Sequence, residues 1–447
     1  MTLRDLFSSA AIAACFDDDA LLRAMLDFER ALARAEAGCG VIPASAADGI
    51  ERGSRDVRFD LHALVREARR AGTLAIPFVK QLTAAVAAVD ADAARYVHWG
   101  ATSQDVLDTA LVLQSRQATR ALLAQLDRLG DAVARLADLH RRTPTVARTL
   151  LQPAAPVPFG WKAAVWLDAL TRSRVGLARA ASAAEALQFG GASGVRAALG
   201  AAGEAVAQAL ARELDLALPA TPWHAVRDRV ARLGSEVGIA CCVVGKIAGD
   251  VALLMQPEVA EAFEPAGAGR GGSSAMPHKR NPVGAMLARE AGLRVPGLVA
   301  TLVGGVAGEH ERGLGQWQGQ WWTVRDLFAA AGSGTEAMVE VIEGLDVDEA
   351  AMQRNLDATR GFVHAEALAI ALGETLGKTE AHARVEAICR RAQAEQLTLQ
   401  DALASDAELA QRLSSDVQRS VFDPASQFGS AGTMIDRALD AWRNRES

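Results

Sequence analysis

The chain has 447 residues and a formal charge of −7, with an isoelectric point near 5.7. Half of the residues are hydrophobic but only 5% are aromatic, so a core of this composition consists of many small contacts between closely approaching helices. Because no basic surface extends over the whole chain, we expect neither nucleic acid nor a membrane as a partner, and an anionic substrate would need a local group of cations.

The N-terminal segment lacks the features of a secretory signal, because its apolar run is short and is followed by three consecutive aspartates. The five cysteines form no CxxC pair and no regular framework, which is the usage expected in a reducing compartment. We therefore expect a cytoplasmic protein.

Short helical patterns in the first hundred residues are broken by GCGVIPAS at 38–45, and short patterns return after about residue 346. The expected domains are therefore an N-terminal helical domain (1–100), a central bundle of long helices that includes a loop at 267–282 (101–345), and a C-terminal helical domain (346–447).

One long amphipathic helix is predicted from about Asp105 to His140, a stretch without proline. Its apolar residues recur at spacings of four and three; they are Leu122, Leu126, Leu129, Val133 and Leu136. Similar patterns predict four more long helices, at about 160–188, 228–255, 283–306 and 323–344. The predicted fold is all-α, with a central elongated five-helix bundle.

The most apolar segment of the bundle, residues 237–255, is interrupted by Lys246 and Asp250. Both charges would be costly at the centre of a bilayer, so this segment is predicted to be a buried bundle helix. Narrow alanine-rich faces on a long bundle would leave apolar stripes exposed unless other copies covered them. We therefore expect a homo-oligomer.

Polar stretches interrupt this helical pattern at the ends of the predicted long helices, where rigid elements commonly position functional loops. They are HWGATSQD (98–105), RTLLQPA (148–154), GGSSAMPHKRNP (271–282) and EHERGLGQW (309–317). In the third stretch, glycines precede Ser273 and allow backbone amides to approach an anion, while Lys279 supplies a cation. The stretch is typical of a lid over an anion site; the alternative is a linker with a solvated lysine.

The order G-S-S-x-M-P-x-K-x-N-P in this stretch resembles the signature of the fumarase/aspartase superfamily. HWGATSQD and RTLLQPA resemble the first and second substrate loops of that family. The resemblance implies the three-domain all-α fold of the family and a homotetramer in which the long helices of four subunits form the core. It also implies active sites shared between subunits, and chemistry with no metal and no cofactor.

The resemblance also implies roles for individual residues. Ser273 matches the serine that exchanges a proton with the carbon next to a substrate carboxylate, although Ser274 remains an alternative. Lys279 and Asn281 match groups that bind that carboxylate and stabilise the dianionic intermediate. The remaining matches are to substrate-binding positions: Thr102, Ser103 and Gln152.

One position departs from the lyases of the family. Their second loop reads T-H-x-Q, and the histidine helps to protonate the leaving amine or hydroxyl, but this chain has Leu150 there. Leucine supplies no proton, whereas a carboxylate can attack and depart as an anion. The resemblance, which is strongest to a lactonising branch of the family, therefore implies closure of 3-carboxy-cis,cis-muconate to 4-carboxymuconolactone in the protocatechuate branch of the β-ketoadipate pathway.

A tricarboxylate substrate calls for additional cations. Arg312 is the preferred candidate, followed by Arg148 and Arg280. His98 is expected to bind substrate or to orient its loop, and His224 to serve either proton relay or packing.

Two alternatives remain open from the sequence. The first is a β-eliminase similar to adenylosuccinate lyase, because HWGATSQD and PWHAVRDR (222–229) also resemble that branch. The second is a noncatalytic helical scaffold, which the presence of Ser273, Lys279 and Asn281 disfavours.

Overall fold

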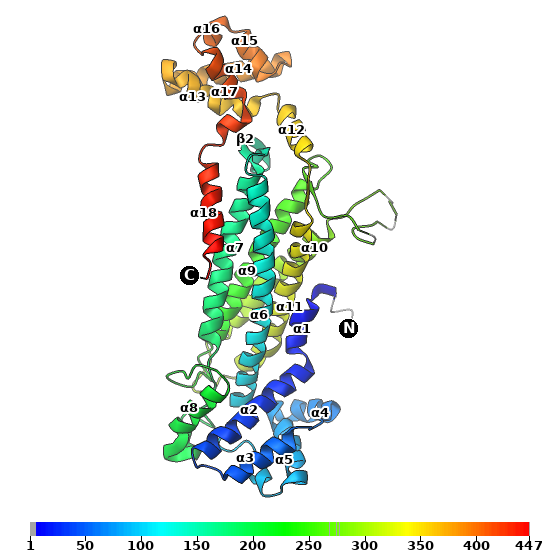
Figure 1. Cartoon of the computed structure of the whole chain (residues 1–447), viewed down its shortest axis with the longest axis vertical. Coiled ribbons are helices and arrows are strands. Elements are labelled where there is room, and N and C mark those ends of the chain that lie inside the picture. The colour runs from blue at the N-terminus through cyan, green and yellow to red at the C-terminus, as the bar shows by residue number, and fades with distance from the viewer. Residues whose placement is uncertain (1–5, 268, 274, 277, 447) are drawn as a thin grey trace. The chain divides into compact units, whose positions relative to one another are not determined.

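The computed structural model describes residues 6–267, 269–273, 275–276 and 278–446 (Figure 1). Within them the chain forms eighteen α-helices and only two small two-stranded sheets, so the predicted all-α class is confirmed. The chain divides into two compact units. Unit 1 comprises Met1–Ala124, Gly176–Cys242 and Ala291–Ser333, and unit 2 comprises Gln125–Val175, Val243–Glu290 and Gly334–Ser447.

Five long helices each contribute one part to unit 1 and another part to unit 2. They are α6 (Ser103–Leu139), α7 (Phe159–Ala184), α9 (Asp228–Leu254), α10 (Val283–Gly304) and α11 (Gln316–Glu343). All five were predicted, although α11 begins seven residues before its predicted start and α10 contains Pro296. The apolar stripe predicted for α6 is buried, which confirms the face assigned from its spacing.

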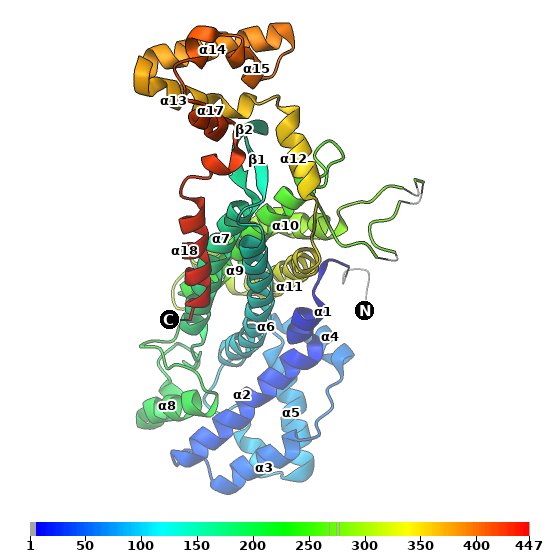
Figure 2. The ribbon, with the colours of Figure 1, turned by 45° about the horizontal axis from the view of Figure 1, so that its top comes forward.

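Shorter helices of unit 1 pack beside one another, as Figure 2 shows. They are α1 (Ala10–Ala13), α2 (Asp18–Gly38), α3 (Ala44–Ser54), α4 (Leu61–Ala71), α5 (Ala75–Val89) and α8 (Gly203–Glu213). Asp17 caps α2 by accepting a hydrogen bond from the Ala20 amide. The buried face of α2 carries Met25, Phe28 and Leu32, and α2 contacts both α3 and α8.

Unit 2 contains an antiparallel ribbon of β1 (Pro144–Thr149) and β2 (Gln152–Pro158). The sequence analysis did not identify it, because the ribbon includes four prolines, which argue against a central strand but are tolerated in an exposed two-stranded pair. A second pair joins β3 (Ala262–Phe263) to β4 (Asp346–Val347).

The C-terminal helices of unit 2 enclose a core of their own that includes Leu368, Leu372 and Ile388. The helices that contribute to this core are α13 (Ala365–Leu376), α14 (Lys378–Glu395), α15 (Leu399–Ala404), α16 (Ala407–Ala410) and α17 (Ser415–Phe422). Unit 2 also contains α12 (Glu349–Ala358) and α18 (Ala431–Arg443). The predicted division into three domains remains a prediction.

Candidate functional site

The first polar stretch ends at the start of α6, where Asp105 accepts a hydrogen bond from the residue before the helix. Thr102 precedes the helix, and its backbone amide donates to Asp105 Oδ2 over 3.0 Å. Asp105 stands three residues into the turn, so the sequence T-S-Q-D fixes where α6 begins. The amide groups of this turn and the positive end of the helix dipole favour an anion beside Thr102 and Ser103.

Asp105 also gathers two other segments of unit 1. Its carboxylate accepts hydrogen bonds from the amides of Gly190 and Gly191, both at 2.9 Å, and from His224 Nε2 at 2.7 Å. A Cβ atom at Gly190 would lie 2.7 Å from His224 Cε1, so only glycine fits there. Asp105 is fully buried and saturated with donors, and this organises the loops before any ligand binds.

His224 is therefore explained by structure. It is buried, its ring contacts Asp105 and its backbone carbonyl accepts a hydrogen bond from Gln104 Nε2. Of the two roles considered for His224 in the sequence, packing within its own chain is the one that these contacts support.

Arg312 lies on the same group of loops. Its guanidinium donates to Thr102 Oγ1 at 3.3 Å and to the carbonyls of Gly191 and Ala192 at 3.1 and 3.0 Å. All three acceptors are neutral, and within the described ranges Arg312 forms no ion pair. Its positive charge is therefore available to a carboxylate at the start of α6.

Glu309 closes the loop that carries Arg312. It accepts hydrogen bonds from the Leu314 amide and from Gln316 Nε2, at 3.1 and 2.9 Å. The hydrogen bond from the Leu314 amide is the largest of the effects that lower the pKa of Glu309. The loop thus keeps its shape through Glu309 and leaves Arg312 exposed.

A second buried group lies one turn further along α6. Asp108 pairs with Arg227 at 2.5 Å and accepts from Trp317 Nε1 at 2.9 Å and from Gln188 Nε2 at 3.1 Å. Trp317 is buried and packs against this group. Arg227 and Asp108 neutralise each other, so neither charge is free for a ligand.

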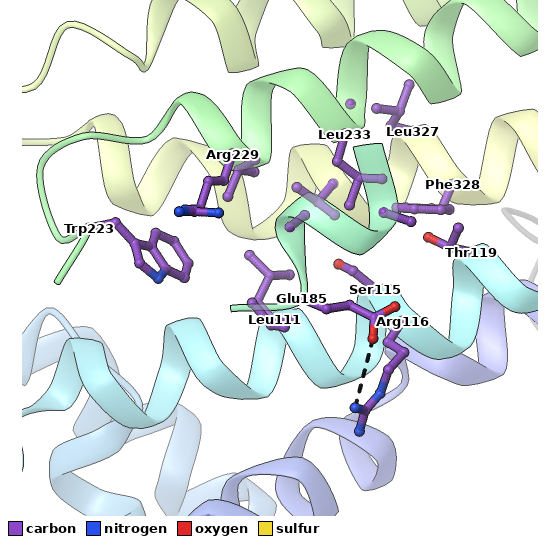
Figure 3. Close-up of a pocket in the computed structure, with 16 residues that line it drawn as sticks. Leu111, Ser115, Arg116, Thr119, Glu185, Trp223, Arg229, Leu233, Leu327 and Phe328 are labelled. Carbon is purple, nitrogen blue, oxygen red and sulfur yellow. Dashed lines mark ion pairs between the residues drawn. The ribbon is translucent and has the colours of Figure 1, made fainter. Parts of the chain in front are cut away.

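A small cavity of about 20 Å³ lies deeper in unit 1, as Figure 3 shows. It is lined by apolar side chains such as Leu111 and Phe328, and by an ion pair of Arg116 with Glu185. A cavity of this size holds about one water molecule. It is too small for a tricarboxylate. The loops at the start of α6 are the candidate site in this unit because they carry Arg312, whose acceptors are all neutral.

The signature stretch of unit 2 forms an exposed loop that begins and ends at a close contact. The Asn281 amide donates to the Gly271 carbonyl at 2.8 Å, and a Cβ at Gly271 would lie 2.6 Å from the Asn281 carbonyl oxygen. Ser273 Oγ accepts from the amides of Ala275 and Met276, at 3.3 and 3.1 Å. Two amide donors leave the hydroxyl proton free to be given away.

Lys279 projects from this loop and is exposed. In the part of the loop that the structure describes it forms no ion pair, so its charge is unneutralised. Asn281 is half-buried, and its side-chain amide contacts the Gly272 carbonyl at 3.4 Å. Ser274 and Pro277 lie outside the described residues.

The ribbon of unit 2 carries Leu150 and Leu151 at its tip. Both have positive φ, 51° and 64°, as the two central residues of a tight hairpin require, although asparagine or glycine usually takes such positions. Leu150 is 96% exposed and Gln152 beside it is also exposed. The tip therefore presents an apolar side chain and an amide, and no group that exchanges protons near neutral pH.

Two other arginines considered from the sequence are engaged within unit 2. Arg148 forms a double hydrogen bond with Glu261, which is fully buried, at 2.6 and 2.9 Å. Arg280 donates to the Glu264 carbonyl at 2.5 Å. Arg148 lies near the tip of the ribbon, opposite Pro153, and anchors that end to Glu261, so Arg312 remains the better candidate for binding substrate.

In unit 1 the structure places Arg312 against Thr102, which directly precedes Ser103. In unit 2, Ser273, Lys279 and Asn281 lie on one loop. Gln152 lies on the ribbon of unit 2, and His98 lies in the first loop of unit 1. The sequence analysis missed the organising role of Asp105, although its spacing from Thr102 was a signal for a helix N-terminus.

Comparisons with known proteins agree with these features. A family model described as lyase matches residues 8–297, and one described as adenylosuccinate lyase C-terminus matches residues 361–438. The chain is 51% identical over 439 residues to a 3-carboxy-cis,cis-muconate cycloisomerase from Bradyrhizobium diazoefficiens, covering 98% of this chain and 97% of the relative.

A second relative is nitrosuccinate lyase from Streptomyces davaonensis, which is 41% identical over 436 residues and covers 96% of this chain and 92% of the relative. Among solved structures, the 3-carboxy-cis,cis-muconate lactonizing enzyme from Pseudomonas putida matches with a TM-score of 0.94 and 43% identity, and the match covers 100% of both chains.

Proposed function

Because the chain belongs to the fumarase/aspartase superfamily of lyases, we propose that it catalyses lactonisation of 3-carboxy-cis,cis-muconate to 4-carboxymuconolactone. Relatives of 46–51% identity over more than nine-tenths of the chain carry this activity in their names. The single observation that carries the chemistry is Leu150 at the exposed tip of the ribbon. It stands where the resemblance places the proton-exchanging histidine of the lyases.

The reaction needs a proton at carbon and none at the attacking oxygen. A carboxylate oxygen of the substrate forms a bond to a carbon of the double bond in the same molecule. The electron pair of that double bond moves toward a neighbouring carboxylate and forms a dianionic intermediate, which takes a proton at carbon. In the reverse direction the carboxylate departs as an anion, so the reaction does not need a proton donor at position 150.

Ser273 is the proposed proton donor. Its Oγ accepts two backbone amides, and these donors stabilise the negative charge that remains on oxygen after the proton has left. Lys279 and Asn281 supply the cation and amide that bind the dianionic intermediate. General acid catalysis of this kind contributes about 10²- to 10⁴-fold to rate.

The remaining carboxylates of the substrate require further donors. Arg312, His98 and the start of α6 with Thr102 and Ser103 provide cations, hydroxyls and a helix dipole in unit 1. Gln152 on the ribbon adds an amide. These assignments of binding residues are part of the proposal.

We further propose a homotetramer with active sites shared between subunits. Support comes from exposed apolar side chains on the long helices, such as Ile239, Met286 and Leu293. By length and composition α9 could also cross a membrane, although half of its most apolar window is buried. Lys246 and Asp250 pair within it, which favours a protein partner over lipid. A cytoplasmic location fits a metabolic enzyme of this kind.

One alternative has a specific observation in its favour. The match of residues 361–438 to the adenylosuccinate lyase C-terminus is compatible with a β-elimination that breaks a carbon–nitrogen bond. Leu150 disfavours it, because a departing amine needs a proton.

Incubation of the purified chain with 3-carboxy-cis,cis-muconate tests the function. We expect loss of the conjugated-diene absorbance and appearance of the lactone in the proton NMR spectrum. A folded chain that leaves the muconate unchanged would contradict the proposal and favour a noncatalytic scaffold.

A further inference from the structure

His98 lies in the first loop, yet its side chain is held by a residue far away in the sequence. Its Nδ1 lies 2.6 Å from Oε1 of Glu29, which is on α2 and is only 2% exposed. The His98 backbone has φ of 59°, a conformation that costs energy for a residue with a side chain and therefore needs support from its surroundings. The contact with Glu29 supplies that support.

Glu36 lies two turns beyond Glu29 on the same face of α2 and is fully buried. Among the described residues, neither carboxyl oxygen of Glu36 has a hydrogen-bond partner. Burial, and after it the negative charge of Glu29, raises the pKa of Glu36 to about 9. Glu36 is therefore neutral at pH 7 and adds no negative charge to this face of α2.

The charged groups that face His98 come from two elements: Glu29 on α2 and Asp105 on α6. Burial favours the neutral imidazole, and the two carboxylates favour the imidazolium. The carboxylates prevail, so the pKa of His98 is raised above its ordinary value. With Nδ1 bound to Glu29, the second proton of the ring is on Nε2.

We propose that Glu29 is a positioning residue for substrate: it fixes the His98 ring through the 2.6 Å contact at Nδ1, so that Nε2 can bind one carboxylate of the substrate. The proposal rests on the proposed function for the identity of that substrate. Neither the sequence motifs nor the comparisons assign a role to Glu29.

The direction of the pH effect follows from the charges. A raised pKa keeps His98 protonated from its ordinary value of 6.5 up to the raised value, and the charge is lost as pH rises through that raised value. Without the charge of Glu29, burial would dominate and His98 would lose its proton below neutral pH. Binding of an anionic substrate would then weaken as pH rises from about 6 to 8.

The test compares Glu29→Gln with Glu36→Gln, two isosteric changes on one helix face. Proton NMR follows titration of His98 in the substrate-free protein, with the resonance assigned through His98→Gln. We expect Glu29→Gln to lower the titration midpoint of His98 and to raise KM for the muconate about tenfold at pH 7.5, with kcat changed by less than about threefold. The KM defect should shrink at pH 6, where the ring regains its proton.

Glu36→Gln should leave both the titration and KM unchanged, because it replaces a group that is already neutral. If Glu29→Gln fails to fold, titration of the unaltered protein still decides, and His98→Gln should reproduce the KM increase without its dependence on pH. A His98 that titrates at or below 6.5, or a Glu29→Gln variant with unchanged KM, would overturn the proposal.

The NMR titration requires no substrate, so it separates this inference from the proposed function. A chain whose His98 titrates as expected but which does not convert the muconate would refute the reaction and leave the Glu29–His98 contact standing.

Discussion

Two regions of the molecule carry the candidate catalytic and binding groups, and they are built in opposite ways. The loops at the start of α6 converge on Asp105, a buried carboxylate with four donors. The loop that carries Ser273 is exposed, and its described contacts are mostly between neighbouring backbone groups. The first region is fixed by tertiary contacts, whereas the second is fixed by glycine geometry and a short backbone bridge.

This difference indicates a division of labour. Groups that bind substrate carboxylates gain most from being preorganised, because fixed donors need not reorganise when charge arrives. A proton donor must reach the substrate carbon and then let the product leave, and an exposed position such as that of Ser273 permits both. Substitutions in the two regions should therefore have different signatures in stability and in turnover.

The largest expected effect belongs to Ser273→Ala. Removal of the hydroxyl removes the proposed proton donor, so we expect kcat to fall by about 10²- to 10⁴-fold. Because Ser273 lies in an exposed loop, the thermal midpoint should stay within about 1 °C of the parent value. Full activity of Ser273→Ala would exclude Ser273 as the proton donor. If Ser274→Ala then lost activity instead, the proton donor would be Ser274.

Asp105→Asn should instead act through stability. An asparagine has one acceptor oxygen, and its amide would point at backbone N–H groups, leaving buried donors unpaired. We expect unfolding in urea to show a loss of about 3 kcal/mol. The control is Asp138→Asn on the same helix, whose side chain is 63% exposed and which should cost less than about 0.5 kcal/mol. Equal losses in both variants would contradict the organising role of Asp105.

Glu36→Gln tests the opposite case to Asp105. Glu36 is also a buried carboxyl group, but we expect it to help neither folding nor catalysis at neutral pH. The folded protein keeps the proton of Glu36 up to about pH 9, whereas the unfolded chain releases it near its ordinary pKa of 4.5. The unfolded state therefore binds fewer protons, and stability falls as pH rises between these values.

Glutamine removes that dependence on pH. We therefore expect the free energy of unfolding of the variant to rise relative to the parent by at most about 1.4 kcal/mol for each pH unit. Urea unfolding at pH 5, 6.5 and 8 measures this. A stability difference that does not grow with pH would mean that Glu36 is ionised in the folded chain.

Arg312→Gln tests whether the preorganised region binds anions. Loss of an unneutralised cation should raise KM about tenfold and change kcat little, because the proposed role of the guanidinium is to bind a carboxylate and not to act on the reacting carbon. Arg232→Gln is the matched control, since Arg232 is 74% exposed and pairs with Asp228. A fall in kcat at constant KM would place Arg312 in the chemical step.

Leu150→His should have the smallest effect. Lactonisation requires no proton at the attacking oxygen, so we expect kcat/KM to change by less than about threefold. Histidine also tolerates positive φ at this tip better than leucine does, so folding should not suffer. A change of more than tenfold in kcat/KM would give position 150 a direct role in lactonisation.

The sequence predicted the five long helices and the positions of the polar stretches, because both depend on local pattern and on spacing along the chain. It did not predict the ribbon around Leu150, where prolines obscure the strand pattern. It also did not predict the contact of His98 with Glu29, which joins residues 69 positions apart. Contacts of this kind depend on how helices pack, and periodicity carries no information about them.

Arg148 illustrates the same limit at the site. The sequence offers several arginines near polar loops, and only the structure shows that Arg148 is neutralised by buried Glu261 while Arg312 meets neutral oxygens. Charge alone does not select a binding residue, because an available cation also has to lack a local partner.

The most direct test is a comparison of leaving groups in the unaltered chain. Steady-state rates are measured with 3-carboxy-cis,cis-muconate, adenylosuccinate and argininosuccinate under one set of conditions. If leucine at the ribbon tip restricts the enzyme to departing anions, kcat/KM for the muconate should exceed the other two by at least about 10⁴-fold. Ready cleavage of a carbon–nitrogen bond, with the muconate left intact, would contradict the proposal that leucine at the ribbon tip restricts the enzyme to departing anions.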